Sequence, residues 1–241
     1  MSSLMTLKRY PSASGMTFGK MGARRMMWSI NNLLPKGARW VEYLESTGTQ
    51  WIDTGVNVGY SQNSIGGLEA KFSLQSNQSV SVADTSPWIV GCWENSQANA
   101  FLYKPCSRPN LENLAALIFR NTRTSASPLS LQSWHTVSIR NGMLKQDNAN
   151  VGTYPTSPTG ASTLPIALFA LRQASMMYAK VKFAYCRMYG LDDTTIIRDF
   201  RPIAIGASGY MLDLISGEYL QYGNAGTGDF VIGPDAPAPT I

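Results

Sequence analysis

The stretch SWHTVSIRNGMLK, Ser133–Lys145, decides the fold of this protein. Residues 134–140 alternate between apolar and polar side chains, which is the period of a half-buried β-strand. The dipeptide Asn141-Gly142 that follows is typical of a two-residue hairpin turn, because both residues tolerate a positive φ. Residues 143–145 then provide the return strand. The stretch therefore predicts a β-hairpin with one buried face.

Strand-like segments recur at regular spacing on both sides of this hairpin. They alternate or are continuously apolar, and Gly, Ser, Asn or Pro separates them. We expect strands at 40–44, 50–54, 68–74, 88–93, 115–119, 164–171, 181–189, 196–205, 210–214 and 218–220. About a dozen short strands with hardly a helical segment among them predict an all-β, two-sheet antiparallel sandwich.

The composition fits this fold class. The chain has 241 residues, of which 44% are hydrophobic and 10% aromatic, so it can fill a core. Only 15% are charged, which is low for a protein with long exposed helices, because such helices need Glu and Lys. Three dispersed cysteines (Cys92, Cys106 and Cys186) form no CxxC pair, and we interpret them as buried free thiols.

Charge divides the chain into an arm and a body. Residues 1–41 contain seven Lys and Arg and no Asp or Glu, which leaves 13 basic against 15 acidic residues in the rest. We expect a basic N-terminal arm over residues 1–33, a sandwich domain over 34–233 and a Pro-rich extended tail over 234–241. The arm has no apolar stretch of signal-peptide length and the chain has no run of about 18 apolar residues, so neither export nor a membrane span is expected.

Two stretches resemble a known group of proteins. LPKGARWVEYLESTGTQWIDTGV (34–56) is similar to the opening of structural proteins of phages and prophages, and RDFRPIAIGASGYMLDLISGEYLQYGNAGTGDF (198–230) resembles their closing pattern. SWHTVSIRNG (133–142) and LPIALFALR (164–172) are similar to core strands of concanavalin A-like, laminin-G-like jelly rolls. The resemblance covers roughly residues 34–233 and omits the arm.

This resemblance implies a jelly-roll domain without catalytic residues, acting as a structural component of a tailed bacteriophage virion. Capsid decoration, a head fibre or fibre tip, and a tail accessory protein are all compatible with it. Such a protein would be made in the host cytoplasm, associate with other virion proteins as a homo-oligomer and bind host surface glycans, with no specific nucleic acid. The alternatives are a bacterial surface carbohydrate-binding adhesin module and, less favoured, a glycan-degrading enzyme.

The residues themselves provide little for catalysis. His135 is the sole histidine, and its place in an alternating strand is explained by the fold. A glycosidase needs two facing carboxylates, and spacing does not show convergence among Glu42, Glu45, Asp53, Glu69, Asp192, Asp193 and Asp213. Asp192-Asp193 predicts a turn, with Asp193 as the cap of the following segment. No cofactor is expected; calcium held by loop carboxylates is the one metal that the resemblance leaves open.

Two sets of side chains are candidates for binding. The arm would dock on another virion protein through charged and apolar anchors, namely Lys8, Arg9, Arg24, Arg25, Met26, Met27, Trp28 and Ile30. Aromatic rings in the loops of the sandwich would stack on sugar rings, the candidates being Trp88, Trp93, Tyr103 and Tyr154.

Overall fold

The computed structural model describes residues 33–57, 65–75, 88–92, 94, 102–108, 111–119, 122–126, 129–154, 162–172, 177–221, 223–224 and 228–240, with residues 102–126, 177 and 223–224 described by their backbone alone. All regular structure in these residues is β, and no helix capable of crossing a membrane occurs in the ranges described. The predicted all-β class is therefore confirmed. The arm, with all eight docking candidates from Lys8 to Ile30, lies outside the described residues.

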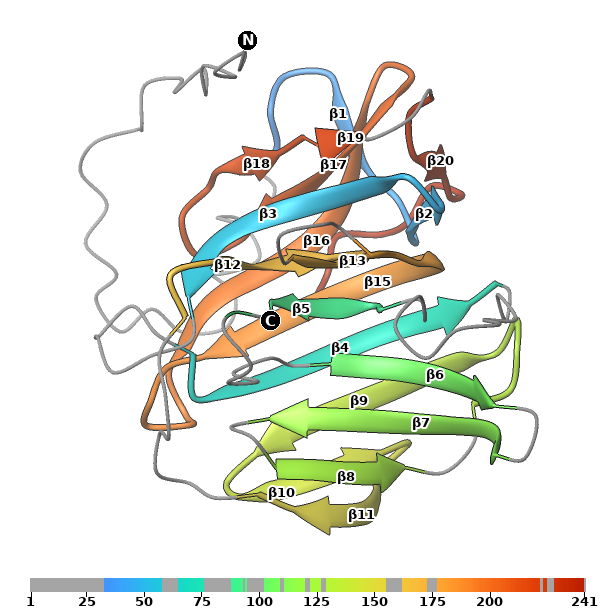
Figure 1. Cartoon of the computed structure of the whole chain (residues 1–241). Coiled ribbons are helices and arrows are strands. Elements are labelled where there is room, and N and C mark those ends of the chain that lie inside the picture. The colour runs from blue at the N-terminus through green and yellow to red at the C-terminus, as the bar shows by residue number, and fades with distance from the viewer. Residues whose placement is uncertain are drawn as a thin grey trace, which may run out of the picture.

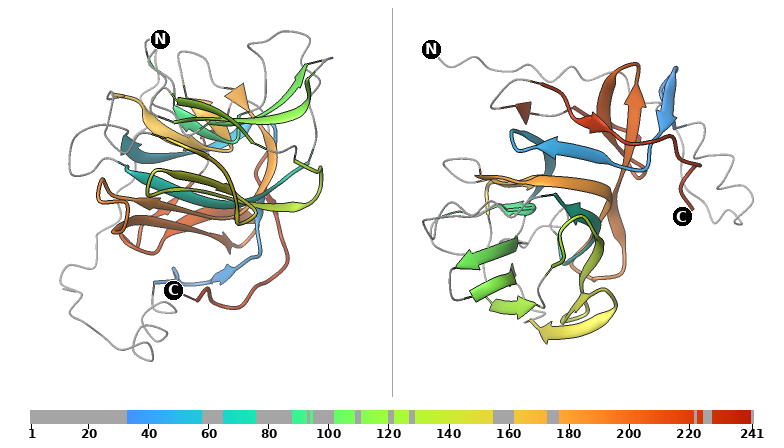
Figure 2. Two further views of the ribbon diagram at one scale, coloured as in Figure 1. Left: turned by 90° about the horizontal axis from the view of Figure 1, so that it is seen from below. Right: turned by 90° about the vertical axis from the view of Figure 1, so that its right-hand side faces the viewer.

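The described strands form two layers (Figures 1 and 2). The first layer is an antiparallel sheet of eleven strands, in which β4 and β15 occupy the middle of the order β11-β10-β9-β4-β15-β16-β17-β18, with β1, β2 and β20 alongside. Its strands are β1 (Ala38–Trp40), β2 (Leu44–Thr47), β4 (Gly67–Leu74), β9 (Trp134–Arg140), β10 (Met143–Gln146), β11 (Ala149–Thr153), β15 (Lys180–Tyr189), β16 (Ile196–Ile205), β17 (Ser208–Asp213), β18 (Tyr219–Leu220) and β20 (Val231–Ile232).

The second layer contains a six-stranded and a three-stranded group. The six strands are β3 (Gln50–Asn57), β5 (Val90–Cys92), β12 (Pro165–Leu168), β13 (Ala170–Arg172), β14 (Met177–Tyr178) and β19 (Gly223–Asn224). The three strands β6 (Leu102–Arg108), β7 (Leu111–Phe119) and β8 (Thr122–Ala126) follow on in the same layer, where β6 contacts β5 and β8 contacts β11 (Figure 1). One pair, β13 with β5, is parallel, so the sandwich is not antiparallel throughout.

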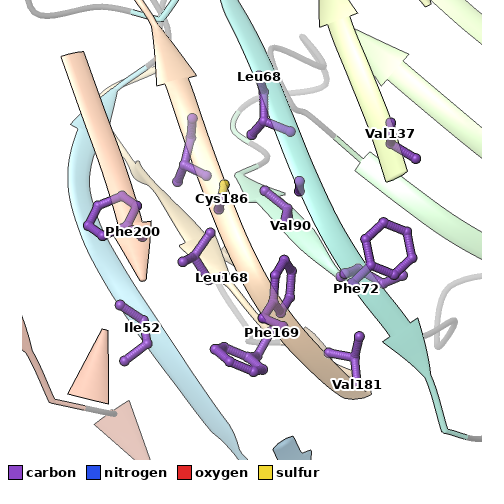
Figure 3. Close-up of a cluster of buried hydrophobic side chains, with 14 of the residues drawn as sticks. Ile52, Leu68, Phe72, Val90, Val137, Leu168, Phe169, Val181, Cys186 and Phe200 are labelled. Carbon is purple, nitrogen blue, oxygen red and sulfur yellow. The ribbon is translucent and has the colours of Figure 1, made fainter. Parts of the chain in front are cut away.

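The hydrophobic core lies between the layers. Alternation along the strands turns one set of side chains inward, and the largest fully buried ones include Phe72, Phe169, Phe183 and Phe200. Figure 3 shows side chains of both layers meeting there, with Ile52 and Leu168 from the second layer beside Cys186 and Phe200 from the large sheet. This shared core makes the two layers one unit.

The quoted hairpin is confirmed. Asn141 and Gly142 have φ values of 53° and 70°, and Met143 pairs with Arg140 across the two-residue turn. The segment 164–171, in contrast, is not one strand. Phe169 has a φ of 65° and separates β12 from β13. Its ring packs against Phe183 and Phe230 at centroid distances of 4.7 and 4.6 Å, and this packing offsets a backbone strain of about 1–3 kcal/mol.

A second, smaller cluster holds the chain ends of the body. Trp40, Ile203, Leu212 and Leu214 lie on the outward side of β16 and β17, and residues 33–38 and 236–238 pack over them. The Pro-rich tail is therefore extended but attached. The Glu42 amide donates to Pro234 O at 2.9 Å, and the Ala236 amide donates to Trp40 O at 3.0 Å. Leu33 already packs with the body, which places the start of the folded unit at or before this residue.

Candidate binding face

The outward side of four neighbouring strands in the large sheet carries polar and aromatic side chains. Strand register aligns them in rows across β15, β4, β9 and β10. The rows are Lys182–Ser73–Trp134, Tyr185–Lys71–Thr136 and Arg187–Glu69–Ser138–Lys145. With Tyr43, Glu45, Arg140, Lys180, Asp199 and Arg201 beside them, these residues make up what we call the outer face.

A buried ion cluster fixes one side of the outer face. Asp199 is 1% exposed, and its carboxylate accepts hydrogen bonds from Arg187 Nε at 3.0 Å and from Arg201 Nε at 2.7 Å. Burial alone lowers the pKa of Arg187, but the charge of Asp199 and the hydrogen bond to it outweigh burial, so this pKa is raised. Arg187 is thus held charged, and the hydrogen bonds to Asp199 hold both guanidinium groups in fixed positions.

Tyr185 lies among these groups. Its hydroxyl donates to Glu69 Oε1 at 2.9 Å, and the guanidinium carbon of Arg201 lies 4.7 Å from its ring centroid. Burial raises the pKa of Tyr185, and the negative charge of Glu69 raises it further. Tyr185 therefore remains a neutral hydrogen-bond donor, and this side of the outer face is rigid.

The opposite side of the outer face presents an exposed indole. Trp134 is 41% exposed, and Tyr43 lies next to it with ring centroids 6.0 Å apart and planes tilted by 54°. Lys71 Nζ is 5.7 Å from the Trp134 centroid, and Lys182 Nζ is 4.5 Å from the Tyr43 centroid. The two rings form a corner with an ammonium group against each, so the corner combines apolar area with positive charge.

A shallow hollow lies farther along β9 on the same face. It has a volume of about 150 Å³ and is lined by Ser138, Arg140, Asn141, Met143 and Lys145. Arg140 is positioned by Tyr189, whose ring centroid lies 3.9 Å from the guanidinium carbon, and donates to Asp193 O at 3.1 Å. The lining contains two cations and no carboxylate, so the hollow favours an anionic group.

His135 points the other way, into the core, where it is 8% exposed. Its Nδ1 is 2.7 Å from Asp147 Oδ2 and its Nε2 is 3.3 Å from Ser130 Oγ. These three side chains are arranged in the order Ser–His–Asp, as in a catalytic triad. However, Nε2 is also 3.1 Å from the Ser130 carbonyl oxygen, which only accepts hydrogen bonds. Both oxygens of Ser130 therefore lie within hydrogen-bond distance of Nε2, and the imidazole is held by contacts at both ring nitrogens.

Asp147 shows what this arrangement does instead. Its Oδ1 accepts the Thr136 amide at 2.8 Å, and its own amide donates to Thr136 O at 2.8 Å. Through His135 and Asp147, the loop before β9 is fastened to the turn between β10 and β11. The structural role expected for His135 stays a prediction.

The two described candidates for sugar stacking lie in the core. Trp88 is 8% exposed and Tyr154 is 7% exposed, and at this burial neither ring offers a face to a sugar. The packing of the sandwich uses these loop aromatics as core residues, so we do not retain them as binding residues. Trp93 lies outside the described residues, and Tyr103 lies on β6, where the structure describes the backbone alone.

Other predicted residues take structural positions. Cys92 and Cys186 are free and buried, as expected, whereas the Cys106 side chain lies outside the described set. Burial raises the pKa of the Cys92 thiol to about 11. Asp192, and not Asp193, caps the segment that follows: it accepts the Thr194 and Thr195 amides at 3.0 and 2.9 Å. Asp193 instead accepts hydrogen bonds from the Asn141 amide and the Tyr154 hydroxyl.

Three of the seven carboxylates considered for catalysis lie in separate ion pairs. Asp53 pairs with Arg172, Glu45 lies 3.7 Å from Lys182, and Asp213 lies 3.4 Å from Arg198. Within the described part of the chain, no three His, Cys, Asp or Glu side chains gather as a metal site would require. Loop carboxylates in that part thus give no positive support for calcium.

Sequence reasoning missed Trp134, Tyr43 and the Arg140–Lys145 hollow. A signal was present for Trp134, because it occupies the polar side of the alternating strand together with Thr136, Ser138 and Arg140. An aromatic residue on the polar side of an amphipathic strand points to solvent. Tyr43 and Lys145 had no comparable signal, since their place depends on pairing with strands distant in sequence. No model of a known protein family matches this chain, and no curated protein is detectably similar to it.

Proposed function

We propose that this chain is a non-enzymatic structural component of a tailed bacteriophage virion. Its body would be a concanavalin A-like or laminin-G-like jelly roll, displayed as a capsid decoration, a head fibre or fibre tip, or a tail accessory protein. Residues 1–33 would dock it on another virion protein, and copies would associate in the particle.

The observation that carries the proposal is the division of charge between arm and body. Seven basic and no acidic residues occur in positions 1–41, against 13 basic and 15 acidic residues elsewhere. The arm joins the body at a firm attachment, because Leu33, Leu34 and Ala38 pack over the cluster formed by Trp40, Ile203, Leu212 and Leu214. A basic segment anchored to a sandwich that carries little net charge is suited to an acidic partner surface.

The two stretches that carry the family resemblance support the proposed fold. Strands of the first stretch pair with strands of the second, β1 with β16 and β3 with β19, and β2 pairs with β20, which directly follows the second stretch. Gln50, in the first stretch, donates to the carbonyl oxygens of Gly228 and Asp229 at 3.5 and 3.3 Å. Two patterns that are far apart in sequence thus form one structural unit, as a shared fold would require.

Deleting residues 1–32 tests the docking role. We expect a soluble sandwich with an unchanged urea midpoint that no longer incorporates into phage particles, as measured by immunoblotting of gradient-purified virions. A companion variant replaces Lys8, Arg9, Arg24 and Arg25 by Gln and retains the apolar anchors. It should associate more slowly but still incorporate, because exposed ion pairs contribute only about 0–1 kcal/mol each. Normal incorporation of the deletion variant would refute the proposal.

Glycan binding is the second candidate function, within the same particle or in a bacterial surface adhesin module. The exposed Trp134 beside Tyr43 favours it, because an exposed aromatic ring offers apolar area on which a sugar ring can stack. A glycan-degrading enzyme is the least favoured alternative, because His135, the sole histidine of the sequence, is only 8% exposed and its ring nitrogens contact Asp147 and Ser130.

A further inference from the structure

We propose that the outer face binds an acidic oligosaccharide, extended along β9 from the Trp134–Tyr43 corner to the hollow between Arg140 and Lys145. This inference rests on the glycan-binding part of the proposed function and names its site and ligand class. The ligand would carry carboxylate or phosphate groups on its sugar rings.

The first step is the spacing of the two ends. Trp134 and Ser138 are four residues apart on the same side of one strand, and Arg140 is six residues from Trp134. At about 3.3 Å per residue these intervals are about 13 and 20 Å. On the outward side of β9, the only side chains between Trp134 and Arg140 are the hydroxyl side chains of Thr136 and Ser138. The distance suits several linked sugar rings and exceeds the size of a single monosaccharide.

The second step is the chemistry at each end. The Trp134 indole offers apolar area for the carbon-bound hydrogens of a sugar ring, while Lys71 and Lys182 hold positive charge against the corner. The hollow at the other end has Arg140 and Lys145 among its five lining residues. Arg140 is already fixed by Tyr189 and Asp193 O, so little side-chain entropy is lost when it binds an anion.

The third step is the balance of charge on the outer face. Its cations are Lys71, Arg140, Lys145, Lys180, Lys182, Arg187 and Arg201, and its carboxylates are Glu45, Glu69 and Asp199. The residues after position 41 as a whole are mildly acidic, with 13 basic against 15 acidic residues. The outer face itself therefore has an excess of cations over carboxylates, which favours an anionic ligand over a neutral one.

The test measures binding of the full-length protein to defined polymers by calorimetry. Two acidic saccharides serve as probes: a short oligogalacturonate carries carboxylate groups and a phosphomannan carries phosphate groups. Dextran is the neutral saccharide. Poly-glutamate and oligo-dT are anionic polymers that are not acidic oligosaccharides. We expect binding to one or both acidic saccharides, weakened by added salt, and at least about ten-fold weaker binding to the other probes.

Variants locate the site. Trp134→Ala should weaken binding of the acidic saccharide about ten-fold, or about 1.4 kcal/mol, because it removes the stacking ring, and Trp134→Phe should retain most of the binding. Lys145→Gln should weaken binding of acidic saccharides and leave binding of dextran unchanged. The matched controls are Ile215→Ala, an exposed apolar residue off this face, and Lys36→Gln, an exposed lysine off this face. Because Trp134 is exposed, its replacement should leave the fold intact. Unchanged urea midpoints will show that all the variants are folded.

Each outcome decides the inference. No binding to either acidic saccharide, equal binding to dextran, or equal binding to poly-glutamate or oligo-dT would overturn it, as would an unaffected Trp134→Ala variant. Particle incorporation is a separate readout: Trp134→Ala should incorporate normally, and the chain lacking residues 1–32 should still bind the saccharide. Failure of the saccharide site therefore remains distinguishable from failure of arm docking.

Discussion

Replacing Gln50 by alanine should lower the free energy of unfolding by about 2–4 kcal/mol. Gln50 is fully buried at the turn that leads from β2 in the large sheet to β3 in the second layer. Its Oε1 accepts the Thr47 amide at 2.8 Å, and its Nε2 donates to Asp229 O at 3.3 Å. The side chain thereby connects the turn to the last segment of the sandwich.

The magnitude follows from the groups that lose their partner. Truncation leaves the Thr47 amide and the Asp229 carbonyl without Gln50, and an unsatisfied buried polar group costs about 1–3 kcal/mol. Because Thr47 itself is exposed, water can reach part of this site, which favours the lower half of that range for each group. Two such groups give the expected loss. Gln50→Glu should be similarly destabilising, since a carboxylate cannot donate to the carbonyl oxygens of Gly228 and Asp229.

Urea unfolding followed by tryptophan fluorescence measures this loss. The matched control is Asn57→Ala at the other end of β3, whose amide makes one exposed 3.4 Å hydrogen bond to Thr163 O and should cost less than about 0.5 kcal/mol. The slope of the free energy against urea should stay the same in both variants. A loss below about 1 kcal/mol for Gln50→Ala would refute the reasoning that this side chain holds the two layers together.

Three further predictions follow from buried groups and chain ends. Asp199→Asn should destabilise the fold by about 2–4 kcal/mol in urea unfolding, because Arg201 and Arg187 lose their shared buried carboxylate; an unchanged midpoint would contradict the ion cluster. Burial raises the pKa of Cys92 from 9.0 to about 11, so the unfolded thiol ionises first and stability should fall as the pH rises from 9 towards 11. Cys92→Ala should make this fall smaller, and an identical pH profile would refute it. Deleting residues 234–241 should lower the free energy of unfolding by about 1–3 kcal/mol, because it uncovers Trp40. The control Asp235→Ala breaks only the exposed ion pair with Arg39 and should lower it by less than about 1 kcal/mol in the same urea measurement.

The sequence by itself determined the local β-structure. Alternation in β9 and β4, and the positive φ values of Asn141 and Gly142, depend on interactions between neighbours in the chain, so the pattern predicts them well. Burial of Cys92 and Cys186 was also predictable, because both lie in apolar strands. The division of charge between arm and body required no structure at all.

Tertiary structure alone decided how these elements combine. β4 lies between β9 and β15, and this long-range pairing is what brings Trp134, Lys71 and Tyr185 onto one face. The reversal at Phe169 was hidden within an apolar run, because packing against Phe183 and Phe230 outweighs the local preference for a continuous strand. Trp88 and Tyr154 look like ligand platforms in sequence but fill the core, since an aromatic ring gives no local sign of which side of a loop will be covered. Strand pairing, which local sequence does not encode, therefore decides which aromatic rings lie on the outer face and which fill the core.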